Sequence, residues 1–240
     1  MNICLLKCGS VRKELLHING DHEDMFISLF NKYAPSLNLS VFDIQKENYP
    51  ENLDQYDGYL STGSPDSVYY DINWIKSYKN FTRELFLQHH KHVGICFGHQ
   101  MIAEALGGKV EKSVRDWGIG IKSFQIFTYT PWMNNKVIEN YRLIVSHQDQ
   151  VVKLPENAEV IAGNDHCPIG IFTVGNHVLG IQQHPEFTKE YHIASINSRR
   201  NIIKPELIET ALKSMDQNTD SGIVAKWIEN FFNTKDVEYG

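Results

Sequence analysis

Val93-Gly94-Ile95-Cys96-Phe97-Gly98-His99-Gln100 is the stretch that decides the fold of this chain. A short apolar run, predicted as a strand, ends in a cysteine with a glycine two residues before it and another two residues after it. A helix-compatible segment, residues 101–106, follows at once and stops at Gly107. Strand, cysteine and helix in this order predict a nucleophile elbow, a sharp strained turn in which cysteine replaces the better-known serine.

The two glycines have a physical reason in such a turn. A Cβ atom at position 94 or 98 would collide with the neighbouring backbone, because the chain doubles back closely there. The helix that begins at Cys96 directs its positive N-terminal end at the sulfur and favours thiolate over thiol. On this motif alone, a buried structural cysteine between two turn glycines remains an alternative.

A second apolar run leads into His184-Pro185-Glu186. In an extended segment, residues two apart point to the same side, so Glu186 is expected to follow His184 into one pocket and orient it. The proline between them fixes φ and stiffens the pair. A cysteine nucleophile, a histidine base and a carboxylate are sufficient for acyl transfer, and their wide separation in sequence is usual for triads.

Taken together, four motifs resemble the class I (triad-type) glutamine amidotransferases. Over roughly the first 187 residues the chain carries Ser61-Thr62-Gly63-Ser64-Pro65, Gly94-x-Cys96-x-Gly98-x-Gln100, Ser146-His147-Gln148-Asp149-Gln150-Val151 and His184-Pro185-Glu186. The segment at 146–151 is similar to the Ser-His-x-Asp-x-Val segment of the GMP-synthetase branch. Stand-alone members of that branch, which include γ-glutamyl peptidases, resemble the chain most.

The resemblance implies a role for each matching residue. Cys96 would attack a γ-glutamyl carbonyl and form a thioester, with backbone N–H groups of Gly63 and Phe97 as the oxyanion hole. His147 and Asp149 are candidates for the α-carboxylate and α-amino ends of the substrate, although a structural turn role is an alternative for both. Gln100 lies one helical turn past the cysteine and is expected to help hold the substrate.

The sequence leaves the leaving group open. One hypothesis is a glutaminase subunit that passes ammonia to a separate synthase, because the last ~50 residues are too few for a synthase module. Another is a self-sufficient γ-glutamyl peptidase that releases an amino acid or amine. A third is a non-catalytic regulatory or binding subunit, and the intact triad argues against it.

Composition sets broad limits. The chain has 240 residues, 42% apolar and 22% charged, with a formal net charge of −6, which favours one globular domain over residues 1–240. That charge gives no reason to expect nucleic acid or a membrane as a partner. The four cysteines and the absence of an export signal predict a cytoplasmic protein. No metal or other cofactor is expected, and His89, His90 and His92 are interpreted as structural.

The pattern predicts an α/β fold, with a mostly parallel, helix-covered sheet in the first half and short strands in the second. The expected strands are 3–7, 39–44, 58–61, 92–95, 118–128, 141–145, 159–162, 169–174 and 177–181, and the expected helices 21–33 and 71–90, the latter capped by an aspartate. Residues 187–240 are expected to form a helical C-terminal extension, with Pro205 in the first turn of one helix and Ser221 as the cap of another.

Overall fold

The structure is a computed structural model that describes residues 1–133 and 138–234. Its first half alternates strands and helices, as the apolar runs and helical periodicities predict. The elements in order are β1 (Asn2–Lys7), α1 (Leu16–Asn19), α2 (His22–Tyr33), β2 (Asn38–Asp43), β3 (Gly58–Ser61), α3 (Asn73–Leu87), β4 (His92–Ile95) and α4 (Phe97–Ala105).

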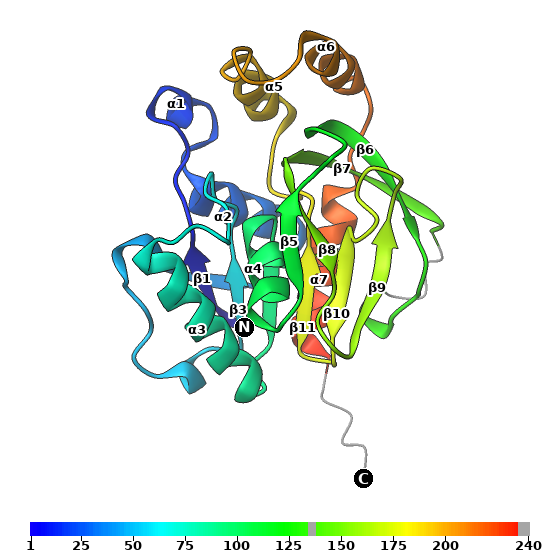
Figure 1. Cartoon of the computed structure of the whole chain (residues 1–240). Coiled ribbons are helices and arrows are strands. Elements are labelled where there is room, and N and C mark those ends of the chain that lie inside the picture. The colour runs from blue at the N-terminus through cyan, green and yellow to red at the C-terminus, as the bar shows by residue number, and fades with distance from the viewer. Residues whose placement is uncertain (134–137, 235–240) are drawn as a thin grey trace.

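The second half is rich in strands and ends in helices (Figure 1). Its elements are β5 (Lys109–Lys112), β6 (Gly118–Ile126), β7 (Asn140–His147), β8 (Asp149–Lys153), β9 (Ala158–Gly163), β10 (Ile171–Val174), β11 (Val178–Ile181), α5 (Lys189–Asn197), α6 (Pro205–Ser214) and α7 (Ser221–Asn233). Strands β5 and β8 were not among the expected elements, whereas α5 lies within the expected helical extension. The predicted helical extension is confirmed as far as residue 234, and residues 235–240 of it lie outside the described part.

Within the described residues one nine-stranded sheet runs through both halves, in the order β2-β1-β3-β4-β11-β10-β9-β6-β7. The first five strands of this order are parallel, and the others are antiparallel to their neighbours. Strands β5 and β8 form a separate pair. The predicted α/β fold is therefore confirmed, and the continuous sheet supports our proposal that the chain is one domain.

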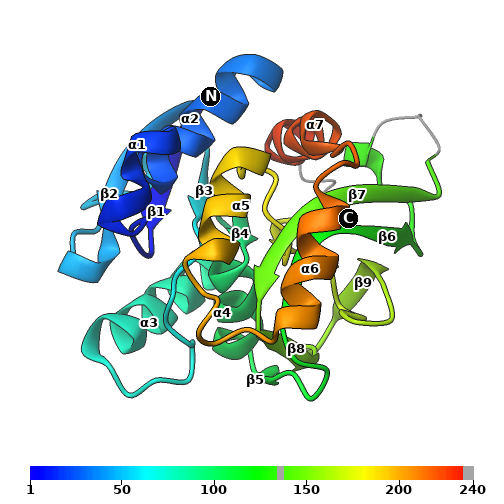
Figure 2. The same ribbon diagram turned by 90° about the horizontal axis from the view of Figure 1, so that it is seen from above.

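Helices cover both faces of the parallel part because its strands are apolar on both sides. In β1, Ile3 and Leu5 pack in one core cluster with α2 and α7, whereas Cys4 and Leu6 pack in another with α3 and α4. This period of two assigns alternate residues to opposite faces. Figure 2 shows α3 and α4 on one side of the sheet and α7 on the other.

The return of the chain to the centre of the sheet positions the site. Strand β11 pairs parallel to β4, with Ile181 opposite Ile95, and the N–H of Cys96 donates to the Ile181 carbonyl at 2.8 Å. Residues that follow β4 and β11 therefore meet at the carboxyl edge of the sheet, where α/β proteins place their sites. In Figure 1, α1, α5 and α6 lie above this edge.

Two predicted helix caps are wrong. Helix α3 begins at Asn73, so Ile72 and not the expected Asp71 occupies its cap position, and Asp71 forms an ion pair with Lys76. Ser221 is the first residue of α7 and not its cap. The residue before it, Asp220, accepts a hydrogen bond from the Arg142 N–H at 2.7 Å and so ties α7 to β7.

Candidate active site

Cys96 occupies the predicted turn between β4 and α4. Its φ of 53° and ψ of −97° lie in a region that side chains rarely adopt, so the turn is strained. A Cβ atom on Gly94 would lie 2.5 Å from the Gly98 carbonyl oxygen, and one on Gly98 would lie 3.0 Å from the Ser61 carbonyl oxygen. The predicted collisions are confirmed, and they explain why both positions are glycine.

His184 reaches the same place from the end of β11. Its N–H donates to the Ile144 carbonyl at 2.9 Å, which fixes the backbone against β7. The chain then bends at residues 185 and 186 instead of staying extended, yet Glu186 still contacts His184 as expected. Glu186 lies buried behind His184, with its Oε1 atom 2.7 Å from His184 Nδ1.

The charge state of His184 follows from its partners. Burial disfavours the imidazolium, but the charges of Glu186 and Cys96, and side-chain hydrogen bonds to both, outweigh it and raise the pKa of His184 to about 10. Phe187 stacks on the ring, with centroids 3.9 Å apart and planes within 5°. With Nδ1 directed at Glu186, the other ring nitrogen is left for Cys96. The arrangement can hold a thiolate beside a protonated, oriented imidazole.

A cleft of about 380 Å³ opens above these residues. It brings together most of the predicted site residues, since its walls include Gly63, Cys96, Gln100, His147, Asp149 and His184. Glu186 and Phe97 do not line it. The Phe97 side chain is buried in the core against Trp74 and Tyr78, so only the backbone of Phe97 is positioned to act on a substrate.

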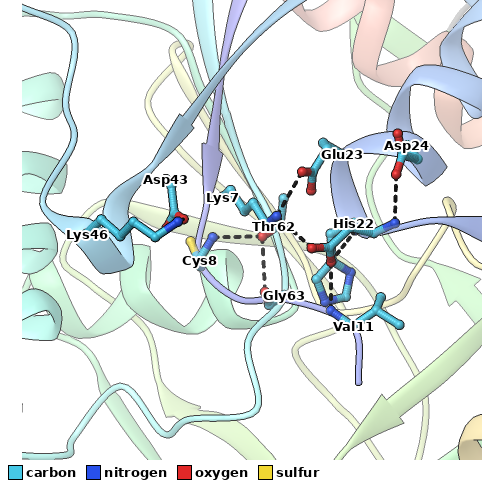
Figure 3. Close-up of polar contacts among 11 residues, drawn as sticks. Lys7, Cys8, Val11, His22, Glu23, Asp24, Asp43, Lys46, Thr62 and Gly63 are labelled. Atoms are coloured by element: carbon cyan, nitrogen blue, oxygen red, sulfur yellow. Dashed lines mark hydrogen bonds and ion pairs between the residues drawn. The ribbon is translucent and has the colours of Figure 1, made fainter. Parts of the chain in front are cut away.

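Gly63 forms the wall opposite His184. A Cβ atom on Gly63 would lie 3.1 Å from His184 Cε1 and 3.7 Å from Cys96 Cβ, so its backbone is close to both side chains. The buried Thr62 hydroxyl holds this loop, as it accepts from the Cys8 N–H at 2.9 Å and donates to the Gly63 carbonyl at 3.0 Å (Figure 3). Because Cys8 directly follows β1, these bonds fix the position of Gly63 relative to Cys96.

An ion-pair network fixes the wall that follows β1. Lys7 Nζ lies 2.6 Å from Asp21 and 2.8 Å from Glu23, and Asp21 also accepts from the N–H groups of Val11 and His22 (Figure 3). Burial opposes the charge of Lys7, but these two carboxylates outweigh it and raise the pKa of Lys7. Val11 and His22 both line the cleft and are held in place by these bonds.

Gln100 and Asp149 are bound to each other and to nearby loops. The side-chain amide of Gln100 donates to the Asp149 carbonyl at 2.8 Å and to Gln182 Oε1 at 3.1 Å. The Asp149 carboxylate accepts from the hydroxyls of Ser67 and Tyr69, the latter at 3.1 Å. Both amide hydrogens of Gln100 are thus used within the protein, and its expected role in holding a substrate stays a prediction.

His147 is buried, with only 4% of its surface exposed, yet it lines the cleft. Neither ring nitrogen has a hydrogen-bond partner among the described residues. Burial first, and then the neighbouring His166, lower its pKa well below the ordinary value, so the ring is neutral at pH 7. An unpartnered polar group in such a place is suited to a polar ligand atom.

Several residues of the cleft were missed by sequence reasoning. They form a part of its border that we call the rim: Arg12, Trp117, Arg199 and Ile202. Trp117 immediately precedes β6. The two arginines and Ile202 lie in irregular segments that carry no motif, so nothing in the sequence marks them.

Other kinds of site find no support in the described residues. Residues 1–133 and 138–234 contain no group of three or more His, Cys, Asp or Glu side chains that could hold a metal ion. His92 instead lies 2.9 Å from the Ser61 hydroxyl. Within the same ranges, none of the helices has the length and apolar character needed to cross a membrane.

The sequence matches a model of the family "Glutamine amidotransferase class-I" over residues 21–201. The chain belongs to this family. It is 29% identical over 206 residues to γ-glutamyl peptidase 3 of Arabidopsis thaliana, a match that covers 82% of each chain. It is also 30% identical to a GMP synthase of Caldanaerobacter subterraneus, over 72% of this chain but only 32% of that protein. These similarities support the interpretation that the chain is an enzyme.

The fold also matches solved structures. A glutamine amidotransferase from Thermotoga maritima superposes with a TM-score of 0.74, covering 98% of this chain and 99% of that one. Sequence identity between the two is 19%, so this likeness bears on the fold alone. The resemblance seen in four short motifs therefore extends over the whole architecture.

Proposed function

We propose that the chain is a hydrolase that cleaves the γ-amide of glutamine or of a γ-glutamyl compound through a thioester on Cys96. The observation that carries the proposal is the placement of Cys96 and His184 in one cleft at the carboxyl edge of the sheet, with Glu186 hydrogen-bonded to His184 at 2.7 Å. Similarity to a γ-glutamyl peptidase over 82% of the chain supports the same substrate class.

The first half of the reaction forms the acyl-enzyme. The Cys96 thiolate attacks the γ-carbonyl carbon and makes a new C–S bond, while the carbonyl oxygen becomes an oxyanion. His184, protonated at neutral pH because of Glu186 and Cys96, donates its proton to the leaving nitrogen. The C–N bond breaks, ammonia or an amine departs, and a γ-glutamyl thioester remains.

The second half hydrolyses the thioester. His184, now neutral, removes a proton from water as the water oxygen attacks the same carbonyl carbon. The C–S bond breaks, glutamate departs, and the thiolate and imidazolium are restored. Glu186 keeps Nδ1 of the imidazole in place throughout both steps, since its Oε1 lies 2.7 Å away.

The oxyanion is stabilised in this proposal by backbone N–H groups of Gly63 and Phe97. Gly63 approaches both reacting side chains closely, and the Phe97 N–H belongs to the first turn of α4, where no earlier carbonyl is available to it. Removing one donor of this kind typically costs about 2.7–4 kcal/mol of transition-state stabilisation. His147, neutral and unpartnered, and Asp149 remain the candidates for the α-carboxylate and α-ammonium of the substrate.

Similarity to GMP synthase favours a second candidate, a glutaminase subunit that supplies ammonia to a separate synthase. The two candidates differ in their leaving group and in their need for a partner. A glutaminase subunit gains from being inactive until its partner docks, whereas a peptidase is active alone and tolerates a leaving group larger than ammonia.

One assay tests the function and separates the candidates. Purified protein is given glutamine and a γ-glutamyl dipeptide at equal concentrations, and release of glutamate and of ammonia or amino acid is measured. We expect activity without a second protein and a kcat/KM for the dipeptide at least equal to that for glutamine. A strong preference for glutamine would favour the subunit, and inactivity on both substrates would contradict hydrolysis by the chain alone.

A further inference from the structure

Arg199 is a cation in the cleft that pairs with no carboxylate of the described residues. It follows α5 and lines the same cleft as Cys96. Its Nη1 atom donates to the Ser146 hydroxyl at 2.9 Å, and its guanidinium lies over the Trp117 ring, 5.9 Å from the centroid. Among the described residues it forms no ion pair with a carboxylate, although Asp66 and Asp149 line the cleft too.

Such a group favours an anionic ligand. A guanidinium has five N–H donors in a planar fork that matches a carboxylate, and the Ser146 hydroxyl uses only one of them. Burial lowers the pKa of Arg199, and the nearby charge of Arg12 contributes to this, whereas Tyr191 and Cys96 act in the opposite direction. A charge held in this way gains more from an incoming carboxylate than an exposed one does.

The position of Arg199 relates it to the leaving group. The leaving nitrogen must lie within hydrogen-bond distance of His184 to take its proton. Phe187, Tyr191 and Arg199 follow His184 along one segment and border the cleft with it, so Arg199 lies on the segment that also carries the proton donor. The candidate groups for the glutamyl end, His147 and Asp149, come from the end of β7 and from β8, and Arg199 touches β7 through Ser146.

The rim widens the positive region. Arg12 is exposed and lines the cleft, and its Nη1 atom donates to Ser198, one residue before Arg199, at 3.2 Å to the carbonyl and 3.3 Å to the hydroxyl. Two guanidiniums from the loop after β1 and the segment after α5 thus meet at the rim. A partly exposed rim also has room for leaving groups of different sizes.

We propose that Arg199, assisted by Arg12, binds the free carboxylate of the leaving group, so that the preferred substrates are γ-glutamyl amino acids or peptides and not γ-glutamyl amines. The inference rests on the proposed γ-glutamyl hydrolysis. The ligand chemistry is a carboxylate, and its other possible source is the α-carboxylate of the glutamyl group itself.

A matched pair of substrates distinguishes these sources. γ-Glutamylglycine and γ-glutamylglycinamide differ only in the terminal carboxylate, and glutamine has neither group. For the unaltered protein we expect kcat/KM on γ-glutamylglycine to exceed that on the amide at least tenfold. Arg199→Gln should reduce this ratio to about one, mainly through a higher KM for γ-glutamylglycine, and Arg199→Lys should give an intermediate ratio because it keeps charge without the fork.

Arg200→Gln is the control, because Arg200 is exposed, hydrogen bonds to Asn197 and does not line the cleft. It should leave the ratio as it is in the unaltered protein. A ratio near one in the unaltered protein would overturn the proposal. So would an Arg199→Gln variant that loses activity equally on all three substrates, since that result assigns Arg199 to the glutamyl α-carboxylate.

Binding separates failure of this inference from failure of the proposed function. Calorimetric titration of Cys96→Ser protein with the two dipeptides needs no turnover. We expect the free carboxylate to bind at least tenfold more tightly than the amide, and Arg199→Gln in the same background to remove the difference. Tight, carboxylate-dependent binding without hydrolysis by the unaltered protein would refute the proposed hydrolase activity and support the carboxylate subsite. Equal binding of the two dipeptides, or no binding of either, would refute the subsite.

Discussion

The base and the rim of the cleft differ in how they are built. The base consists of Cys96, Gly63 and His184, each placed within three residues of the end of a sheet strand and fixed by backbone hydrogen bonds or by contact with another base residue. The rim consists of Arg12, Trp117, Arg199 and Ile202, which lie in irregular segments and are exposed or half-buried. A rigid base suits chemistry that is the same for every substrate, and a looser rim suits selection among substrates.

This comparison makes a general prediction about kinetics. Changes at the base should lower kcat on every substrate, because they remove interactions made in the transition state. Changes at the rim should alter KM for some substrates and leave KM for the other substrates unchanged. Substitutions at the two places, from the largest expected effect to the smallest, test whether that division holds.

Cys96→Ala should have the largest effect. Without the sulfur no thioester forms, and loss of a nucleophile of this kind typically lowers kcat by about 10⁴-fold to 10⁶-fold. The fold should persist, because the turn glycines remain and alanine removes a single atom. Glutamate release from both glutamine and a γ-glutamyl dipeptide is measured beside a thermal melt. Turnover within tenfold of the unaltered protein would refute Cys96 as the nucleophile.

Glu186→Gln should act on every substrate through His184. Burial disfavours the imidazolium, and Glu186 is the first of the groups that overcome it to raise the pKa of His184 to about 10. Because the leaving nitrogen needs the proton of the imidazolium, kcat/KM of the unaltered protein should fall as pH rises through that value. Removal of the carboxylate charge lowers the pKa, so the alkaline limb of the variant should move to lower pH.

The measurement is kcat/KM against pH for both proteins, on glutamine and on a dipeptide. We expect the limb to move by at least one pH unit and kcat at pH 7 to fall about 10²-fold to 10⁴-fold, as for other triads that lose their orienting carboxylate. An unmoved alkaline limb with lowered kcat would mean that Glu186 orients His184 without controlling its charge.

The sequence predicts the base far better than the rim, for physical reasons. Gly94, Cys96 and Gly98 are fixed by steric requirements of one turn, so a local motif contains the whole constraint. His184 and Glu186 are only two residues apart, so one short motif contains both partners of their contact, although the bend of the backbone at residues 185 and 186 does not follow from it. The pairing of β11 with β4, which brings the two motifs together, is a long-range property.

The rim and the short strands lack such local constraints. The guanidinium of Arg199 contacts Ser146 and Trp117, which are distant in sequence and are brought to it by the fold. Strands β5 and β8 went unpredicted because they pair only with each other and are half polar, so their pattern does not differ from that of a loop. The expected cap at Asp71 is wrong because α3 begins two residues later, at Asn73, which leaves Asp71 outside the cap position.

Gly94→Ala should destabilise the base without touching its chemistry. The added methyl would lie 2.5 Å from the Gly98 carbonyl oxygen and 2.7 Å from the His99 nitrogen, both backbone atoms of the elbow. Overpacking of this kind costs about 1–3 kcal/mol, and we expect the upper end, or a Tm lower by roughly 6–12 °C for a chain of this size. Thermal melts of both proteins measure it.

Gly107→Ala is the matched control for that substitution. Gly107 has a φ of 94°, but no atom lies within 4 Å of an added Cβ, so the change brings backbone strain without collision. The fall in Tm for Gly107→Ala should be less than half of the fall for Gly94→Ala. Equal losses at both positions would show that strain alone requires the glycine at position 94.

Arg12→Gln should have the smallest effect and is the sharpest test of the rim. Arg12 is exposed, so its attraction for a leaving-group carboxylate is weakened by solvent, and we expect KM for γ-glutamylglycine to rise only about twofold to fivefold at low salt. The difference should disappear near 1 M salt, where the Debye length is about 3 Å.

Arg12 also donates to Ser198 beside Arg199, so the loss of Arg12 could raise the same KM in a second way, by releasing Ser198. Arg12→Lys separates the two routes, since it keeps the charge and loses the forked contact. If KM follows the charge and the salt, the rim acts electrostatically, whereas a salt-independent rise shared by both variants would mean that Arg12 acts by holding Ser198. A fall in kcat on glutamine would mean that Arg12 affects the chemical step, and it would contradict the division of the cleft into base and rim.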